Sequence, residues 1–490
     1  MNYLSFDIGT TCCKCQLFSD TGEILKYCSE EYSFLNKDGK NYADLHGIWN
    51  KVKRMLKEVS KEFEISSVCI SSFGESFVLL DEKDEILFDP MLYTDPRGEK
   101  EAEMLAADFG AEKIFSITGT MPQSMYSVSK LLWIKKHCPE IFSRVKKVFL
   151  ICDYLGYLLT GKQVIDYALA SRTGAFDIET LQFSRFILDR CGIDAAMFSD
   201  PKPTGSIVGE LREEIKKQVG IQGSCVLVLG SHDQVCSALG AGAVKEGDAV
   251  DGMGTVECIT PIFSQKPDNA DMGKEGYVCV PYAVNGLYCT YMFNYSCSSL
   301  MNWLRQDILH GYTGGMKDIY SYLEREIKEQ PTDILVLPYF AGAATPFQNI
   351  GAKGAVLNLK NTTSDSELYQ AFMEGLAMEM RLNAEHCRKY GIKIHRIVAT
   401  GGGANSKKWL SLKASVQNVP VRTLRSSEGG LCGCAMLQSV ALGKAESLED
   451  AARIFVQYKD EFLPEKIRCL AYKEQYKKYK KLYKSLKEFY

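Results

Sequence analysis

The sequence lacks every extreme of composition that would assign it to a special class of protein. It has only 14 prolines in 490 residues, a formal net charge of −3 at pH 7, and 46% hydrophobic against 24% charged residues. These proportions exclude collagen-like, low-complexity and wholly disordered chains. The near-zero charge argues against nucleic acid as a partner and favours small molecules, because binding a phosphate backbone requires an excess of lysine and arginine.

No stretch resembles a secretion signal or a membrane anchor. The first ten residues contain neither a basic nor an apolar stretch of the kind that directs secretion. Uninterrupted apolar runs, such as Val148–Cys152 and Cys225–Leu229, have the length of buried strands and fall far short of the roughly 20 residues of a membrane span. We therefore expect a cytoplasmic protein without a membrane partner.

Several well-known site signatures are also missing. The 18 cysteines include two crowded groups, Cys12-Cys13-x-Cys15 and Cys432-x-Cys434, but neither has the paired CxxC spacing of a zinc site. The chain has no GxxxxGK[ST], GxGxxG, HExxH or GxSxG segment. P-loop, dehydrogenase, zincin and hydrolase functions therefore lose support.

The segments that are present alternate between strand and helix patterns, which predicts an α/β fold with a central sheet in each domain. At roughly 150 residues per domain, the length allows two or three domains. Strands are expected at Tyr3–Phe6 and Val68–Ser72, and helices at Leu45–Glu62 and Val128–Lys136. Tyrosines three or four positions apart in 464–490 predict a C-terminal helix that packs by its tyrosines and keeps its lysines in solvent.

The first predicted strand ends in a turn that suits a phosphate group. Asp7-Ile8-Gly9-Thr10-Thr11 is followed closely by Lys14. Glycine lets backbone N–H groups approach phosphate oxygens, the threonines and the lysine add donors, and Asp7 can hold Mg²⁺ through water. An ordinary hairpin turn is the competing interpretation.

A similar turn occurs about half a chain length later. Gly252-Met253-Gly254-Thr255 follows one predicted strand and precedes the mostly apolar 256–263 region. The repeat indicates a chain of two related halves. The Gly-rich Leu239–Gly247 stretch just before it is the best candidate for the boundary.

A third segment, Ser231-His232-Asp233-Gln234, follows the buried run that ends at Leu229. Loops at the carboxyl ends of strands are where α/β sheets present catalytic groups. Asp233 is expected near the start of a helix, whose dipole favours the ionised carboxylate that can accept a proton from a hydroxyl. Helix capping is the competing interpretation for Asp233, and His232 is expected to be only a neighbour.

The fourth segment is a run of glycines, Thr400-Gly401-Gly402-Gly403-Ala404, between a predicted strand and a predicted helix. Without side chains, these residues leave a flat surface against which an adenosine or phosphate group can lie. A purely structural turn is the alternative. The turn Ser427–Gly430 could form a wall of the same pocket.

These segments resemble the FGGY carbohydrate kinases, a family of the actin-like ATPase clan, along nearly the whole chain. The matching segments occur in the family's order, which is Phe6–Thr11, Asp95-Pro96-Arg97, Asp153-Tyr154-Leu155, Leu159-Thr160-Gly161, Ala170–Gly174, Gly230–Gln234, Gly254-Thr255, Leu337–Pro346, Glu374-Gly375 and Thr400–Ala404. The resemblance implies ATP- and Mg²⁺-dependent phosphorylation of a sugar or polyol. It also implies two ribonuclease-H-like domains with a cleft between them, residues 1–244 for the sugar and 245–490 for ATP.

The resemblance assigns a role to each candidate residue. Asp233 would be the catalytic base, and Asp7 would help to organise Mg²⁺. ATP is expected at Thr10, Thr11, Lys14, Gly254, Thr255, Gly401, Gly402 and Gly403. The sugar is expected at Glu75, Arg97, Asp233 and Gln234.

The sequence departs from the family mostly where the sugar should bind. Phe73-Gly74-Glu75-Ser76 replaces the Gln-Met-His of xylulokinase-like members and only partly matches the Arg-Glu-Thr of glycerol kinases. Met125 stands at the glycerol kinases' pocket tyrosine, and Ala343-Ala344 replaces a charged pair. A ketose such as xylulose is the favoured substrate. Gluconate, fuculose, rhamnulose, glycerol and other polyols stay open, as does a homodimer.

A function of a different class is a non-catalytic, actin-like regulator that responds to sugar. The presence of Asp7, Asp233 and both Gly-Thr turns argues against it, because a regulator needs neither a base nor a metal ligand.

Overall fold

The computed structural model describes residues 1–267, 270–309 and 319–490, and the chain divides into two compact units. Unit 1 contains Met1–Val244, Val278–Tyr288 and Glu428–Val456, and unit 2 contains Lys245–Tyr277, Cys289–Ser427 and Gln457–Tyr490. The chain passes from unit 1 to unit 2 between Val244 and Lys245, which is where the sequence placed the domain boundary. The units are nevertheless not two continuous halves, because two segments of the second half pack within unit 1.

The central sheet of unit 1 combines parallel and antiparallel strands. Across the sheet they are β14 (Ile207–Glu210), β15 (Val226–Val228), β6 (Ser67–Ser72), β1 (Asn2–Ile8), β2 (Cys12–Ser19) and β3 (Ile24–Glu31). β15, β6 and β1 run parallel to one another, β14 pairs antiparallel with β15, and β1, β2 and β3 form an antiparallel meander. β1 is buried along most of its length, as expected for a strand covered on both faces.

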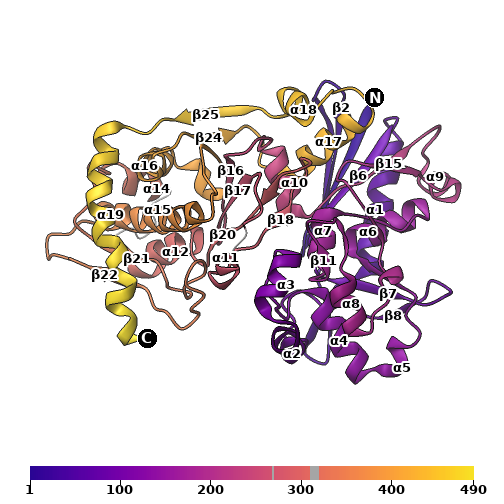
Figure 1. The fold of residues 1–490 in the computed structure, drawn as a ribbon. Helices are drawn as coiled ribbons and strands as arrows, with labels where there is room; N and C mark the ends of the chain where they lie inside the picture. Colours follow the sequence, from indigo (N-terminus) through magenta and orange to yellow (C-terminus); the bar gives the residue numbers. More distant parts are fainter. Residues whose placement is uncertain (268–269, 310–318) are drawn as a thin grey trace. The chain divides into compact units, whose positions relative to one another are not determined.

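Helices from distant parts of the chain cover this sheet (Figure 1). α17 (Gly429–Ala441) contacts β1 and β6, and it packs against α10 (Asp233–Gly240). α1 (Leu45–Ser60) contacts β2 and β3, and it begins where Asp44 Oδ1 accepts a hydrogen bond from Gly47 N (2.9 Å). The capping carboxylate satisfies a backbone donor that the helix itself leaves unpaired.

α10 and α17 approach each other closely because glycine lines their contact. A Cβ atom on Gly240 would lie 1.9 Å from Gly429 O, and one on Gly433 would lie 2.1 Å from Cys236 O. Neither position has room for a side chain, since these distances are far shorter than any van der Waals contact.

Unit 2 repeats the strand pattern of unit 1. Its main strands, in order across the sheet, are β17 (Glu257–Phe263), β16 (Asp248–Met253), β23 (Arg396–Thr400), β24 (Val421–Leu424) and β25 (Tyr458–Phe462), with β20 (Met292–Asn294) also paired to β17. β16 pairs antiparallel with β17 and parallel with β23, as β1 does with β2 and β6. Each unit therefore has an α/β fold, and the turn after β16 corresponds to the turn after β1.

The predicted elements are confirmed, apart from one apolar run. α4 (Ser127–His137) contains the predicted Val128–Lys136 helix. α19 (Lys466–Leu486) buries three tyrosines of the predicted stripe, Tyr472, Tyr476 and Tyr479. The run Val148–Cys152, in contrast, is divided between β9 (Lys147–Leu150) and α6 (Ile151–Thr160).

No helix in the described part of the chain is long and apolar enough to cross a membrane.

The glycine contact between α10 and α17 predicts a measurable cost for added bulk. We expect Gly433→Ala to lower the free energy of unfolding by about 1–3 kcal/mol, because the new methyl group must push α10 away. Urea denaturation measures this change. Gly402→Ala is the control, since a Cβ there would meet nothing within 4 Å. Equal stability of the two variants would contradict the close contact.

Candidate active site

The end of β1 brings Asp7 next to the polar end of β6. Asp7 is in register with Ser71, whose Oγ donates a hydrogen bond to Asp7 Oδ1 (2.6 Å). Burial raises the pKa of Asp7 to about 6 against this hydrogen bond, and the charge of Asp233 adds to the rise. Asp7 and Asp233 are thus close enough to influence each other.

Hydrogen bonds within the turn and from Tyr32 hold the turn after Asp7 in place. Gly9 N donates to Cys12 O (2.9 Å), and the hydroxyl of Tyr32 donates to Gly9 O. Tyr32 N also donates to Thr11 O (2.9 Å), while Thr10 and Thr11 keep contact with solvent. The turn is therefore held in shape while its threonines stay accessible.

Lys14 is paired with a carboxylate rather than extended into solvent. Its Nζ lies 3.1 and 3.0 Å from Oε1 and Oε2 of Glu428, the residue before α17. Gly430, two residues further, faces Asp7, because a Cβ there would lie 3.2 Å from the carboxyl carbon. Of the predicted wall Ser427–Gly430, residues 428–430 thus belong to unit 1 and lie beside Asp7 and Lys14.

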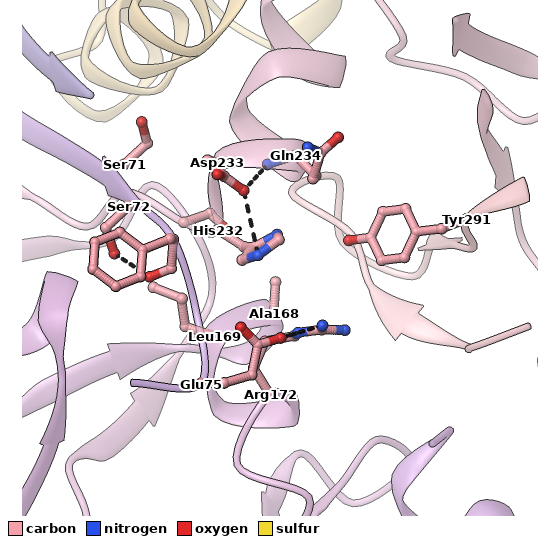
Figure 2. A network of polar contacts seen from close by, with 12 residues as sticks. Ser71, Ser72, Glu75, Ala168, Leu169, Arg172, His232, Asp233, Gln234 and Tyr291 are labelled. Atoms are coloured by element: carbon pink, nitrogen blue, oxygen red, sulfur yellow. Dashed lines mark hydrogen bonds and ion pairs between the residues drawn. The ribbon is translucent and has the colours of Figure 1, made fainter. Parts of the chain in front are cut away.

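Asp233 is the first residue of α10, directly after the buried His232 (Figure 2). Asp233 Oδ1 accepts a hydrogen bond from Gln234 N (2.6 Å) and lies 3.3 Å from His232 Nε2. The side chain is 31% exposed, so a substrate hydroxyl can reach it. His232 is the N-cap residue of α10 and makes no side-chain capping hydrogen bond, so Asp233 is not the N-cap residue, although its carboxylate accepts a hydrogen bond from a donor of the first turn.

The electrostatics around Asp233 differ from the expectation of a carboxylate held charged by the helix dipole. Burial raises the pKa of Asp233 to about 6, although the hydrogen bond from Gln234 and the charge of Arg172 both oppose the rise. The carboxylate is still ionised at pH 7. Burial, and then Arg172, lower the pKa of His232 to about 4, so this imidazole is neutral.

Glu75 lies in the same unit and forms a buried ion pair with Arg172, which follows α7 (Tyr167–Ser171) (Figure 2). Arg172 Nε donates to Glu75 Oε1 (2.5 Å), and the guanidinium stacks 5.3 Å from the ring centroid of Tyr126. Glu75 has a φ of 63°, in the left-handed region that non-glycine residues seldom adopt. A Cβ on Gly74 would lie 3.0 Å from His232 Cδ2, so this loop lies directly against the residue before Asp233.

Arg97, in contrast, has its contacts in a neighbouring cluster. Its Nε donates to Asp95 Oδ1 (2.8 Å), and its guanidinium lies 5.1 Å from the ring centroid of Tyr42 and 5.3 Å from that of Trp133. Lys130, which is fully buried, donates to the carbonyl oxygens of Asp95 and Arg97. The substrate role of Arg97 stays a prediction.

The two glycine segments of unit 2 lie together. A Cβ on Gly401, whose φ is 82°, would lie 2.9 Å from the backbone of Met253, the residue before Gly254. A Cβ on Gly403 would meet the Met253 side chain at 2.9 Å, whereas one on Gly402 would meet nothing within 4 Å. Glycine at 401 and 403 therefore allows close packing against the turn, and Gly402 leaves open space.

The sequence did not single out two residues near Asp233 and Glu75. Arg172 belongs to the recognised Ala170–Gly174 segment, but nothing in its pattern identified Glu75 as its partner. Burial raises the pKa of Tyr93, and the charges of Glu75 and Asp233 raise it further. No sequence signal distinguishes Tyr93 from any other exposed tyrosine.

Proteins that are similar over nearly the whole chain are named as a xylulose kinase and a gluconokinase. A xylulose kinase of Staphylococcus epidermidis is 24% identical over 494 residues, covering 99% of this chain and 97% of the relative. A gluconokinase of Bacillus subtilis is 27% identical over 462 residues, with coverages of 91% and 88%. The crystal structure of a ligand-bound xylulose kinase from Lactobacillus acidophilus has the same fold, with a TM-score of 0.89, 24% identity and coverages of 99% and 98%.

Two family models account for most of the chain. The N-terminal domain of the FGGY family of carbohydrate kinases matches residues 2–240, and the C-terminal domain matches residues 253–442. The matches include both Gly-Thr turns, Glu75, Asp233 and the Gly401–Gly403 loop. The chain therefore belongs to the FGGY family of carbohydrate kinases, enzymes that phosphorylate a sugar with ATP.

Proposed function

We propose that this chain transfers the γ-phosphoryl group of ATP to a hydroxyl of a ketose such as xylulose. Asp233 is the general base that accepts the hydroxyl proton. The observation that carries this assignment is the placement of the Asp233 carboxylate in the first turn of α10, where it is partly open to solvent, and burial raises its pKa to about 6. A base of this kind is matched to proton transfer near neutral pH.

Glu75 and Arg172 support an uncharged sugar over an aldonate such as gluconate. Two contacts from Arg172 to Glu75 neutralise the arginine, so its charge is not available to a substrate carboxylate. Because the pair is neutral as a whole, it offers no net positive charge to such a carboxylate, whereas the Glu75 oxygens can accept hydrogen bonds from sugar hydroxyls. The name of the xylulose kinase relative agrees with this choice, and the name of the gluconokinase relative supplies the alternative that must be tested.

The residues of the first turn fit a magnesium nucleotide. Asp7 is a carboxylate at a strand end whose pKa is raised by burial, and a bound cation would compensate for that burial. Asp7 would hold Mg²⁺ through water, and Thr10, Thr11 and Lys14 would bind phosphate oxygens. When bound, Mg²⁺ neutralises charge on the phosphates. Gly254, Thr255 and Gly401–Gly403 would bind the nucleotide from unit 2.

The cytoplasm is the proposed compartment. None of the 18 cysteines, all of which lie in the described part of the chain, forms a disulfide, and twelve of them are buried; a reducing environment preserves such thiols.

The base role predicts a large and specific loss in one variant. We expect Asp233→Asn to lower kcat by a factor of about 10²–10⁴, because the amide cannot accept the proton, while the Kd for ADP stays unchanged. A coupled assay of sugar-dependent ADP release measures kcat, and calorimetry measures ADP binding. Asp153→Asn is the matched control. Burial raises the pKa of Asp153 to about 8, so at pH 7 its carboxyl is mostly protonated and an amide resembles it. Turnover near wild type in Asp233→Asn would remove Asp233 from the base role, whereas absence of sugar-dependent ADP release in the wild type would favour the non-catalytic, sugar-responsive alternative.

The pKa values predict an acid limb in the pH profile. Asp233 and Asp7 must both be ionised, and each has a pKa of about 6, so kcat/KM should fall as pH drops below about 6. At low pH, kcat/KM should fall by close to a hundredfold per pH unit, because Asp233 and Asp7 each gain a proton. A tenfold slope would mean that only one carboxylate must be ionised. A flat profile down to pH 5 would contradict both roles.

The Glu75–Arg172 ion pair predicts which substrates the enzyme prefers. Wild type should prefer xylulose and other uncharged ketoses to gluconate. Glu75→Gln should lower kcat/KM for the ketose and shift the preference toward gluconate, because Glu75 no longer offsets the charge of Arg172, which then attracts a carboxylate. Glu101→Gln, which replaces another buried glutamate of unit 1, is the control. Wild-type preference for gluconate would overturn the choice of substrate without affecting the kinase assignment.

A further inference from the structure

Unit 2 contains a buried group of three ionisable side chains around the Gly252–Thr255 turn. Asp251 on β16 immediately precedes the turn, and Glu257 is the first residue of β17 after it. Lys413 on α16 (Lys407–Gln417) contacts Asp251 Oδ2 and Glu257 Oε1 with the same Nζ atom. None of the three side chains is more than 1% exposed. We refer to these residues as the Lys413 triad.

Stability alone does not account for the Lys413 triad. Taking charges out of water costs several kcal/mol per ion, and apolar side chains of similar volume often stabilise a core equally well. Asp251 Oδ1 and Glu257 Oε2 are buried without a hydrogen-bond partner in the described part of the chain. Burial, and then the charge of Asp251, raise the pKa of Glu257 in spite of Lys413. The arrangement is therefore costly, and such a cost is compatible with a role in fixing one local geometry.

The triad links the two glycine segments that are proposed to bind ATP. α16 begins just after the Gly401–Gly403 loop, where Ser406 Oγ accepts a hydrogen bond from Trp409 N (3.1 Å). Lys413 lies on this helix, while its two partners lie on the strands at either side of the turn. Thr400 Oγ1, just before the loop, also donates to Asp251 O (3.4 Å). A shift of α16 would therefore strain both ion pairs.

We propose that Lys413 is a positioning residue for the nucleotide. By contacting one carboxylate on each side of the turn, it fixes the distance between Gly254-Thr255 and the Gly401–Gly403 loop. Pre-organisation of this kind lowers the cost of binding, since the two segments need not be ordered by the ligand. The inference rests on the proposed assignment of both segments to ATP.

The test separates nucleotide binding from stability. We expect Lys413→Met to raise the Kd for ADP and the KM for ATP by a factor of about three to thirty, with the KM for the sugar unchanged. Because Lys413→Met leaves two uncompensated carboxylates, the variant Asp251→Asn/Glu257→Gln/Lys413→Met is measured beside it. The triple variant should recover thermal stability, as removal of a whole buried ion group often does, but keep the raised Kd for ADP. A Kd within about twofold of wild type in the triple variant would overturn the proposal.

A matched control is available on α15 (Asp365–Lys389). Glu379 is a buried carboxylate of the same unit that accepts hydrogen bonds from the hydroxyls of Tyr339 (3.0 Å) and Tyr479 (2.6 Å). Glu379→Gln should lower stability and leave the Kd for ADP unchanged. An equal rise of the Kd in Glu379→Gln would show that any disturbance of the core weakens the nucleotide site, which also overturns the proposal.

Thr255→Val distinguishes failure of this inference from failure of the proposed function. If Thr255→Val weakens ADP binding and the triad variants do not, only the positioning role of Lys413 is wrong. If Thr255→Val leaves ADP binding unchanged as well, the assignment of the turn to the nucleotide is wrong.

Discussion

The close contact between α10 and α17 is the constraint on which the site of unit 1 depends. The first turn of α10 carries Asp233, and the start of α17 presents Glu428 to Lys14 and Gly430 to Asp7. Glycine at the contact lets the two helices lie nearly backbone to backbone. The spacing between the proposed base and the proposed metal ligand is therefore set by backbone contacts, which are less variable than contacts between flexible side chains.

Buried charge is used differently in the two units. In unit 1, Glu75 and Arg172 neutralise each other beside the neutral His232, so Asp233 is the carboxylate with an exposed surface and a pKa suited to proton transfer. In unit 2, Lys413 holds two carboxylates that flank a turn. In both arrangements the removal of charged groups from water costs free energy. Both also lie against loops that the family resemblance assigns to ligands.

The repeated strand pattern explains why the two Gly-Thr turns are alike. Each follows a strand that pairs antiparallel with the next strand and parallel with a later one. The segment Glu428–Val456 breaks the simple division into halves, because it belongs by sequence to the second half and packs in unit 1. The pattern of apolar residues cannot reveal which unit this segment belongs to, since α17 would be buried whether it packed in unit 1 or in unit 2.

Local chemistry by itself determined the strands, the turns and the order of the motifs. Asp7, Asp233 and the glycine runs are recognisable because a few neighbouring residues carry the whole signal; alternating patterns predicted the α/β fold, and the resemblance of the ordered motifs to the FGGY carbohydrate kinases supplied the family. The tertiary structure decided which side chains are paired. Glu75 with Arg172, Lys14 with Glu428, and Lys413 with Asp251 and Glu257 join residues far apart in the chain. Such pairs depend on burial and on the packing of separate elements, and neither is encoded in any local pattern.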